Sequence, residues 1–286
     1  MLPHLDIQTF SAVAAIGSFI IAFIKLNSER KKNVLNRKKL AEKDQKIIDL
    51  ENAIYKMTKS SQSFAYKVET LKKEILISPK GDATIKSFFH GLESTQNLTN
   101  LQIPYFQSSN LGDTKLYPPL VKELTSSHVP VSIHDIKISK QKDGSATLSA
   151  FFLVSGYLEK NKTKVDFSSE QFIEKAVAVS REQVLNLYGT STWNLEYCLS
   201  NTIVPIEKLI IVIEFPYQLS EMTTKPQPVC FLQSSHVMHE TEISRIKDDL
   251  NLDQSKVAIL IVQNPTVGLD YGISWVPPSI TKSDKL

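Results

Sequence analysis

The stretch EKLIIVIEF at residues 207–215 is an almost continuous apolar run that is closed by Pro216. A run of this length indicates a strand that is buried on both faces at the centre of a sheet. The stretch KVAILIVQ at residues 256–263 has the same character. We therefore expect both segments to be central strands of a β-rich domain.

Further strand and turn signals flank these two runs. Alternating or apolar segments predict strands at residues 131–139, 146–158, 172–180, 193–200, 228–234 and 270–276. Short helices are expected at residues 83–92, 118–124 and 181–188, the last with a capping box from Ser180 and Gln183. Because the strands follow one another with few helices between them, hairpin connections are favoured over parallel βαβ units. The sequence thus predicts a β-sandwich or α+β distal domain over residues 79–286.

A heptad pattern precedes this domain. With Leu40 taken as position a, most a and d positions up to Ile75 are apolar. Because so narrow a stripe needs a facing helix, we expect residues 27–78 to form a basic juxtamembrane segment and a self-associating coiled coil, with a dimer slightly favoured over a trimer. The alternative is one amphipathic helix that folds back on the distal domain. The predicted contact residues are Leu40, Ile47, Leu50, Ile54, Met57, Phe64, Val68, Leu71 and Ile75.

The N-terminal segment predicts a transmembrane helix that continues into this coil. The apolar run at residues 10–24 reaches the length of a spanning helix, about 20 residues, when it is extended to residues 7–26. Positive charge follows the run instead of preceding it, which argues against a cleaved signal peptide. These basic residues also keep the distal domain on the cytoplasmic side. The predicted topology determinants are Lys25, Arg30, Lys31 and Lys32.

We therefore expect a single-pass anchor at residues 1–26, with the distal domain in the cytoplasm. The lysine-rich composition is typical of low-GC microbial genomes, so the expected membrane is a bacterial inner membrane. The alternatives for residues 1–26 are a buried helix of a soluble domain and a cleaved signal.

Charge and cysteine content narrow the function classes. The chain carries 33 basic and 30 acidic residues, for a formal net charge of +3. The excess basic charge lies beside the predicted anchor and not across the distal domain, which argues against nucleic-acid binding. Cys198 and Cys230 lie far apart without a CxxC motif, so we expect two separate buried thiols.

Motifs for chemistry are sparse. His236, His239 and Glu240 are the densest group of metal-ligating residue types, but their order is HxxHE and not the HExxH of a zinc peptidase. Cys198 would need a nearby histidine to act as a nucleophile, a role that His236 or His239 would have to fill. The chain has no phosphate-binding glycine loop and no GxSxG elbow. We expect no catalytic residue, no metal and no cofactor.

These patterns together predict a membrane-anchored, self-associating protein that presents a cytoplasmic recognition or sensor domain to an unknown protein or small ligand. Clustering at the membrane would raise the effective concentration of weak binding sites. The first alternative is a membrane-tethered hydrolase that uses Cys198 or the His236, His239 and Glu240 group. The second is a structural tether of a membrane complex.

Overall fold

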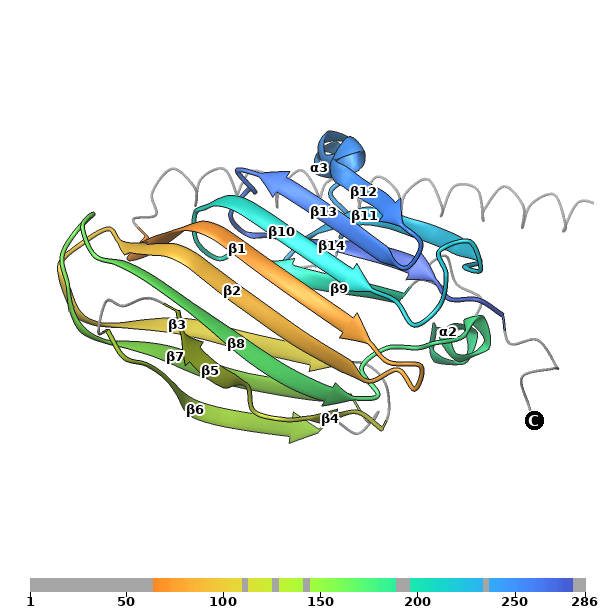
Figure 1. Ribbon diagram of the computed structural model, residues 1–286, viewed down its shortest axis with the longest axis horizontal. Coiled ribbons are helices and arrows are strands. Elements are labelled where there is room, and N and C mark those ends of the chain that lie inside the picture. Colours follow the sequence, from red (N-terminus) through yellow and green to blue (C-terminus); the bar gives the residue numbers. More distant parts are fainter. Residues whose placement is uncertain are drawn as a thin grey trace, which may run out of the picture. The chain divides into compact units, whose positions relative to one another are not determined.

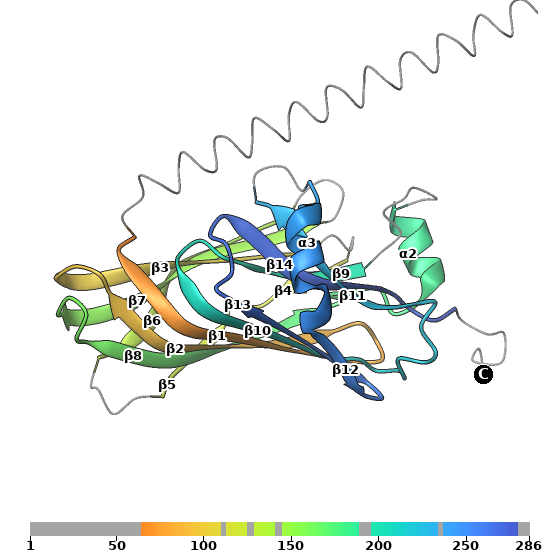
Figure 2. The ribbon, with the colours of Figure 1, turned by 90° about the horizontal axis from the view of Figure 1, so that it is seen from above.

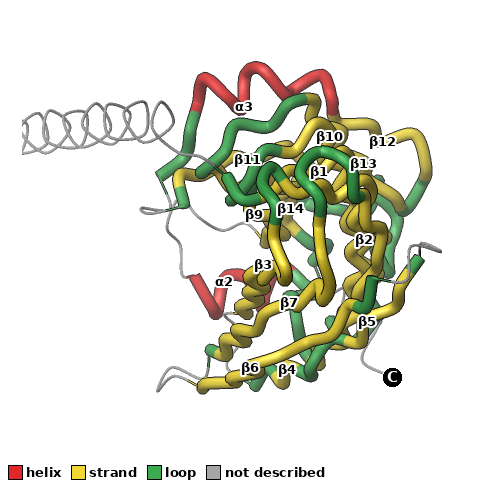
Figure 3. The backbone as a smooth tube through the Cα atoms, turned by 90° about the vertical axis from the view of Figure 1, so that its left-hand side faces the viewer, coloured by secondary structure: helices red, strands yellow, loops and turns green. Residues whose placement is uncertain are grey.

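The computed structural model describes residues 64–109, 113–124, 129–140, 145–188, 196–233 and 237–279, which belong to one compact unit, Ser63–Leu286 (Figure 1). Within these ranges the chain is mostly strand and forms three sheets. The helices described there are α2 (Arg181–Tyr188) and α3 (Glu240–Ile246), and a 3₁₀ turn, η1 (Lys247–Asp249), follows α3. Figure 3 shows α2 and α3 at the periphery, outside the sheets.

The long sheet has eight strands in the order β12-β13-β10-β1-β2-β8-β4, with β5 also paired to β8. Its central pair, β1 and β10, is parallel, whereas the other pairs within the described ranges are antiparallel. The strands are β1 (Tyr66–Ile77), β2 (Ala83–Ser94), β4 (Lys115–Leu116), β5 (Leu120–Glu123), β8 (Lys164–Glu174), β10 (Ile206–Glu214), β12 (Leu250–Gln254) and β13 (Val257–Gln263).

Two three-stranded sheets lie on the same side of the long sheet (Figure 2). The β9 sheet has the order β11-β14-β9, and the β3 sheet has the order β3-β7-β6. In each of them the strand that gives the sheet its name is an edge strand. The strands are β9 (Glu196–Asn201), β11 (Thr224–Leu232), β14 (Leu269–Val276), β3 (Leu98–Ser109), β6 (Val131–Lys140) and β7 (Ala146–Leu158).

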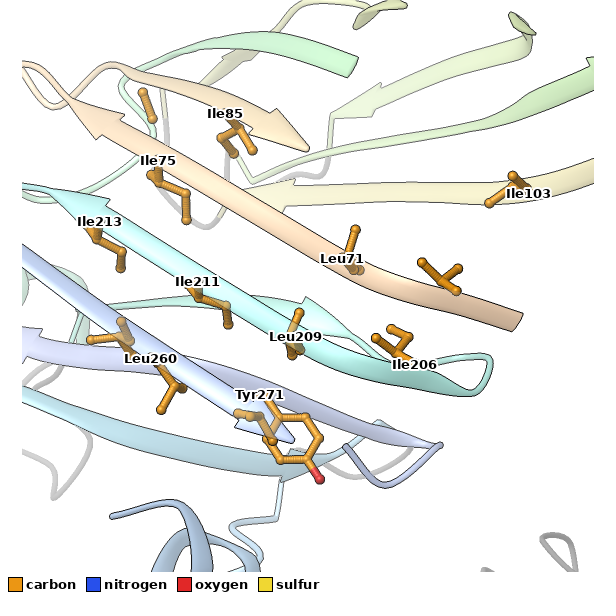
Figure 4. Packing of buried hydrophobic residues seen from close by; sticks show 14 of the residues in the cluster. Leu71, Ile75, Ile85, Ile103, Ile206, Leu209, Ile211, Ile213, Leu260 and Tyr271 are labelled. Carbon is orange, nitrogen blue, oxygen red and sulfur yellow. The ribbon is translucent and has the colours of Figure 1, made fainter. Parts of the chain in front are cut away.

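The hydrophobic core fills the space between the long sheet and the two short sheets. Figure 4 shows Leu209, Ile211 and Ile213 of β10 beside Leu71 and Ile75 of β1, on the same face of the long sheet. The neighbouring residues on β10 point to the opposite face and stay partly exposed. Thus β10 is central, as predicted, but it is not buried on both faces. The strand with every residue buried is β14.

Strand predictions for the second half of the domain agree with β6, β7, β9, β10, β11, β13 and β14. The predicted strand at 172–180 is mostly wrong, because β8 ends at Glu174. Helix α2 starts where the capping box placed it: the Ser180 hydroxyl accepts a hydrogen bond from the Gln183 backbone N–H at 3.2 Å. The helices predicted at 83–92 and 118–124 are wrong, since β2 and β5 occupy these segments.

The predicted fold class is corrected in its N-terminal part. The region predicted to be the end of a coiled-coil helix is strand β1, in which Val68, Leu71 and Ile75 are buried in the core of their own domain. These side chains are therefore not available to a facing helix. Phe64 lies just before β1 and is half-buried. The other predicted contact residues, Leu40, Ile47, Leu50, Ile54 and Met57, lie outside the described residues.

The predicted membrane anchor and location are also corrected. In the part of the chain that the structure describes, no helix has both the length and the apolar character needed to span a bilayer. The segment predicted to do so, residues 1–26, and the topology determinants Lys25, Arg30, Lys31 and Lys32 lie outside that part. The function predicted from these features was a membrane-anchored protein that clusters through its coiled coil and presents a cytoplasmic sensor domain. This functional prediction is therefore wrong as well.

Irregular spacing along β1 explains the wrong helix prediction. Val68 and Leu71 are both buried, so the inward-facing positions advance by three residues there before alternation resumes toward Ile75. At this point Glu69 lies opposite Gly91 of β2, which has a positive φ of 62°. The Gly91 N–H donates to a side chain of β8, and the register of β2 against β8 shifts there. A three-residue step followed by a four-residue step mimics a heptad seam.

Candidate ligand-binding cavity

A cavity of about 460 Å³ lies on the inner face of the long sheet, between the β3 sheet and the β9 sheet. Its floor is formed by β1, β2 and β8, with Lys73 and Ile75 from β1. One wall consists of residues 106–109 of β3 with the start of β7, and the other of residues 197–199 and 201 of β9 with Asp270 of β14. This volume lies within the range of small-molecule sites, about 300–1,000 Å³.

A second cavity of about 240 Å³ has three lining residues in common with the first: Lys73, Phe106 and Asn201. Since these residues belong to β1, β3 and β9, the two cavities adjoin along β1 and meet at Lys73. The remaining lining of the second cavity is mostly apolar and comprises Tyr66, Val68, Leu71, Ser87, Phe89, Ile103, Pro104, Tyr105, Ser200, Ile203, Val204 and Ile206.

Lys73 is the central polar residue of this site. It has the same inward orientation as Leu71 and Ile75, so the regular alternation of β1 directs a lysine into the interior. Its ammonium donates a hydrogen bond to the backbone carbonyl of Leu199 on β9, at 2.8 Å. Burial lowers the pKa of the Lys73 ammonium, while nearby Cys198 and Asp270 act in the opposite direction. Burying this cation is energetically costly, and the nearby Asp270 carboxylate offsets only part of that cost.

Cys198 lies on the same wall but is not an activated nucleophile. The pKa of its thiol is raised to about 12, chiefly by burial; the charge of Lys73 acts to lower this pKa and the charge of Glu196 acts to raise it. Nucleophilic cysteines have the opposite property, a lowered pKa that makes the thiolate available at neutral pH. The predicted hydrolase that uses Cys198 is therefore not supported.

His239 and Glu240, the described members of the predicted histidine group, do not line this cavity. His239 caps α3, because its Nδ1 accepts a hydrogen bond from the Glu242 backbone N–H at 3.3 Å. Glu240 is the first residue of α3 and is exposed, and His236 lies outside the described residues. Within the described ranges, no group of three or more His, Cys, Asp or Glu side chains is arranged to hold a metal ion. Cys230, the other thiol, is buried in β11.

Sequence reasoning missed Lys73 because the heptad pattern placed it on the solvent side of a helix. The signal was present in the alternation of residues 71–77, where the inward positions read Leu71, Lys73, Ile75 and Ile77. Had the segment been interpreted as a strand, a lysine among three apolar inward residues would have indicated a functional site.

Comparisons with known proteins do not assign the chain to a family. No family model matches it, and no curated protein matches it. Among solved structures, an M1 zinc metallopeptidase from Deinococcus radiodurans is 8% identical with a TM-score of 0.31, over 73% of this chain and 42% of that one. A putative protease from Parabacteroides distasonis is 7% identical with a TM-score of 0.33, over 74% and 41%. The chain thus spans less than half of these proteins, and similarity at this level supports no functional argument.

Proposed function

We propose that the domain binds a small ligand with a single carboxylate in the cavity between the β3 and β9 sheets, and that Lys73 is the anchor for that carboxylate. The observation that carries this proposal is an ammonium group directed into a cavity of about 460 Å³. A carboxylate placed there would form a charge-assisted hydrogen bond with the ammonium, which is about twice as strong as a neutral one.

The charge of Asp270 restricts the ligand further. Asp270 is buried and lines the same cavity as Lys73. Its carboxylate repels additional negative charge, so phosphates and dicarboxylates are disfavoured relative to a monocarboxylate. The apolar second cavity beside Lys73 favours a ligand whose carboxylate is attached to an apolar group.

Titration calorimetry on the full chain with N-acetylleucine and with its amide, N-acetylleucinamide, tests this proposal. We expect the acid to bind at least tenfold more tightly than the amide, because about 1.4 kcal/mol separates tenfold affinities and a charged hydrogen bond contributes about 1.5–3 kcal/mol. Equal affinity of the two compounds, or binding of neither, would contradict it.

The matched variants are Lys73→Met and Lys72→Met. Lys72 lies on the opposite face of β1, where its ammonium pairs with Glu74 at 2.6 Å. Lys73→Met is expected to abolish the preference for the acid, and Lys72→Met to leave it unchanged. Thermal unfolding of both variants shows whether a loss of binding reflects a loss of the fold.

A further inference from the structure

Two groups of opposite charge line the larger cavity. Lys73 comes from β1 in the long sheet, and Asp270 comes from β14 in the β9 sheet, where it is buried. Charged side chains are rarely placed so far inside a protein unless they pair with each other or with something that binds there. Because the two residues belong to different sheets, the cavity is the space that they share.

The register of the β9 sheet places Asp270 at the junction of the two cavities. Asp270 lies directly opposite Asn201 of β9, and the side chains of opposite residues share a face, with Cβ atoms about 4.5–5.5 Å apart. Asn201 lines both cavities, as Lys73 does. Burial lowers the pKa of the Lys73 ammonium, and the charge of Asp270 opposes this shift, in agreement with their proximity. A cation and an anion therefore lie together beside the smaller cavity.

Both charged groups have the capacity to bind a ligand. An ammonium has three donors, so Lys73 can bind a carboxylate while one N–H stays on the Leu199 carbonyl, at 2.8 Å. A carboxylate has about four acceptor positions, so Asp270 can accept from a ligand as well as from the protein. A ligand with only a carboxylate would bring its negative charge close to that of Asp270. A ligand that also carries a positive charge compensates both residues.

From this arrangement we infer that the ligand is a free amino acid with an apolar side chain, whose carboxylate binds Lys73 and whose ammonium binds Asp270. This inference rests on the proposed function, since it uses the same lysine as the anchor, and it narrows the ligand class. The side chain enters the smaller cavity, which is walled by Val68, Leu71 and other apolar side chains. A compound that lacks the ammonium leaves Asp270 without its ligand partner, so the site discriminates against it.

Titration calorimetry on the full chain with leucine and with leucic acid tests the inference. The two compounds share the carboxylate and the side chain, and a hydroxyl replaces the ammonium in leucic acid. We expect leucine to bind at least tenfold more tightly, because a hydrogen bond between charged groups is about twice as strong as a neutral one. N-acetylleucine, which also lacks the ammonium, should bind more weakly than leucine. This comparison uses the parent protein, so it does not depend on the folding of a variant.

The matched variants are Asp270→Asn and Asp248→Asn. Asp248 is an exposed residue of η1 and does not line either cavity. Asp270→Asn keeps the shape of the side chain and removes its charge, so it should abolish the preference for leucine over leucic acid. Asp248→Asn should leave that preference unchanged. Thermal unfolding of both variants identifies a result that is caused by misfolding.

The outcomes separate this inference from the proposed function. If leucine and leucic acid bind equally, and each binds more tightly than its amide, the carboxylate site stands and the amino-acid inference is wrong. The inference is also wrong if folded Asp270→Asn retains the preference for leucine, because Asp270 is then not the partner of the ammonium. If leucinamide binds as tightly as leucine, or if no compound binds, both proposals are wrong.

Discussion

The β9 sheet and the β3 sheet both lie on the same side of the long sheet, but their strands differ in how far they are buried. In β14, the central strand of the β9 sheet, every residue from Leu269 to Val276 is buried. In β6, the outer strand of the β3 sheet, every residue from His134 to Lys140 is exposed. The two walls of the cavity therefore differ in packing: the β9 wall is packed from both sides, whereas the β3 wall is held mainly from one.

Aromatic packing in the β9 sheet supports this difference. Trp275 is fully buried and meets Phe215 edge to face, with ring centroids 5.0 Å apart. Its indole N–H donates to the Tyr217 hydroxyl at 3.0 Å. Nearby, the Tyr271 hydroxyl donates to Glu242 of α3, which ties this helix to the sheet. Four predictions test how far the two walls differ, in order of decreasing effect.

The largest effect is expected for Trp275→Ala in β14. The substitution removes a fully buried indole and leaves a cavity, so the free energy of unfolding should fall by about 4 kcal/mol. Urea unfolding followed by circular dichroism measures the change. A loss below about 1 kcal/mol would contradict this difference between the walls, because Trp275 would then contribute little more to stability than a surface side chain.

The next effect is a pH dependence that originates at Glu196 in β9. Burial raises the pKa of its carboxyl from 4.5 to about 7, although the backbone N–H groups of Ala178 and Tyr197 act in the opposite direction. Between these two pH values the folded chain binds more protons than the unfolded chain, so the contribution of Glu196 to stability falls as the pH rises. The loss is complete above pH 7 and amounts to about 3 kcal/mol.

Glu196→Gln should remove this pH dependence of stability. The Gln side chain keeps an oxygen that can accept the hydrogen bond that the Ala178 N–H donates to the Glu196 carboxylate at 3.0 Å. Urea unfolding at pH 5 and pH 8 gives the difference between the parent protein and the variant. The variant should gain stability relative to the parent at pH 8. A constant difference at the two pH values would mean that Glu196 is not buried in the protein as the geometry indicates.

A pair of glycine substitutions compares the two walls directly. A Cβ at Gly272 of β14 would lie 2.2 Å from the backbone carbonyl oxygen of Cys198, so β9 would have to move. A Cβ at Gly156 of β7 would meet no heavy atom within 4 Å, although its φ of 124° makes any side chain strained. Gly272→Ala should destabilise the fold by about 2–3 kcal/mol and Gly156→Ala by about 1 kcal/mol.

The same two variants also test the role of β9 in ligand binding. Because Gly272→Ala displaces the strand that carries the Leu199 carbonyl, it should also weaken ligand binding at Lys73, measured by calorimetry with N-acetylleucine. Gly156→Ala should leave binding unchanged. Equal effects of the two substitutions on both stability and binding would contradict the assignment of β9 as the binding wall.

The smallest effect is expected on the outer strand of the β3 sheet. Ile138 of β6 is 46% exposed, so Ile138→Ala should change the free energy of unfolding by no more than about 0.5 kcal/mol. Urea unfolding under the conditions used for Trp275→Ala provides the test. A loss of 2 kcal/mol or more would require a packing role for β6 like that of β14.

Prediction from the sequence succeeded where strand signals were local. The apolar runs at 207–215 and 256–263, and the segments at 131–139 and 146–158, were recognisable as strands from their own residues. The segment at 66–77 was misassigned because the irregularity in β1 depends on Gly91, which lies in another strand. The candidate site was missed for the same reason. Its residues come from strands whose neighbours are fixed by tertiary pairing and not by sequence order.

The parallel pairing of β1 with β10 has a consequence for the order in which the protein is made. Val68 pairs with Ile206, so the two partners are separated by most of the described chain. At about 5–20 residues per second, a ribosome completes β10 on the order of ten seconds after β1. Until then β1 has a neighbour, β2, on one side only. A strand that is central in the finished protein is therefore an open edge in the nascent chain, and this interval is when chaperones would be needed.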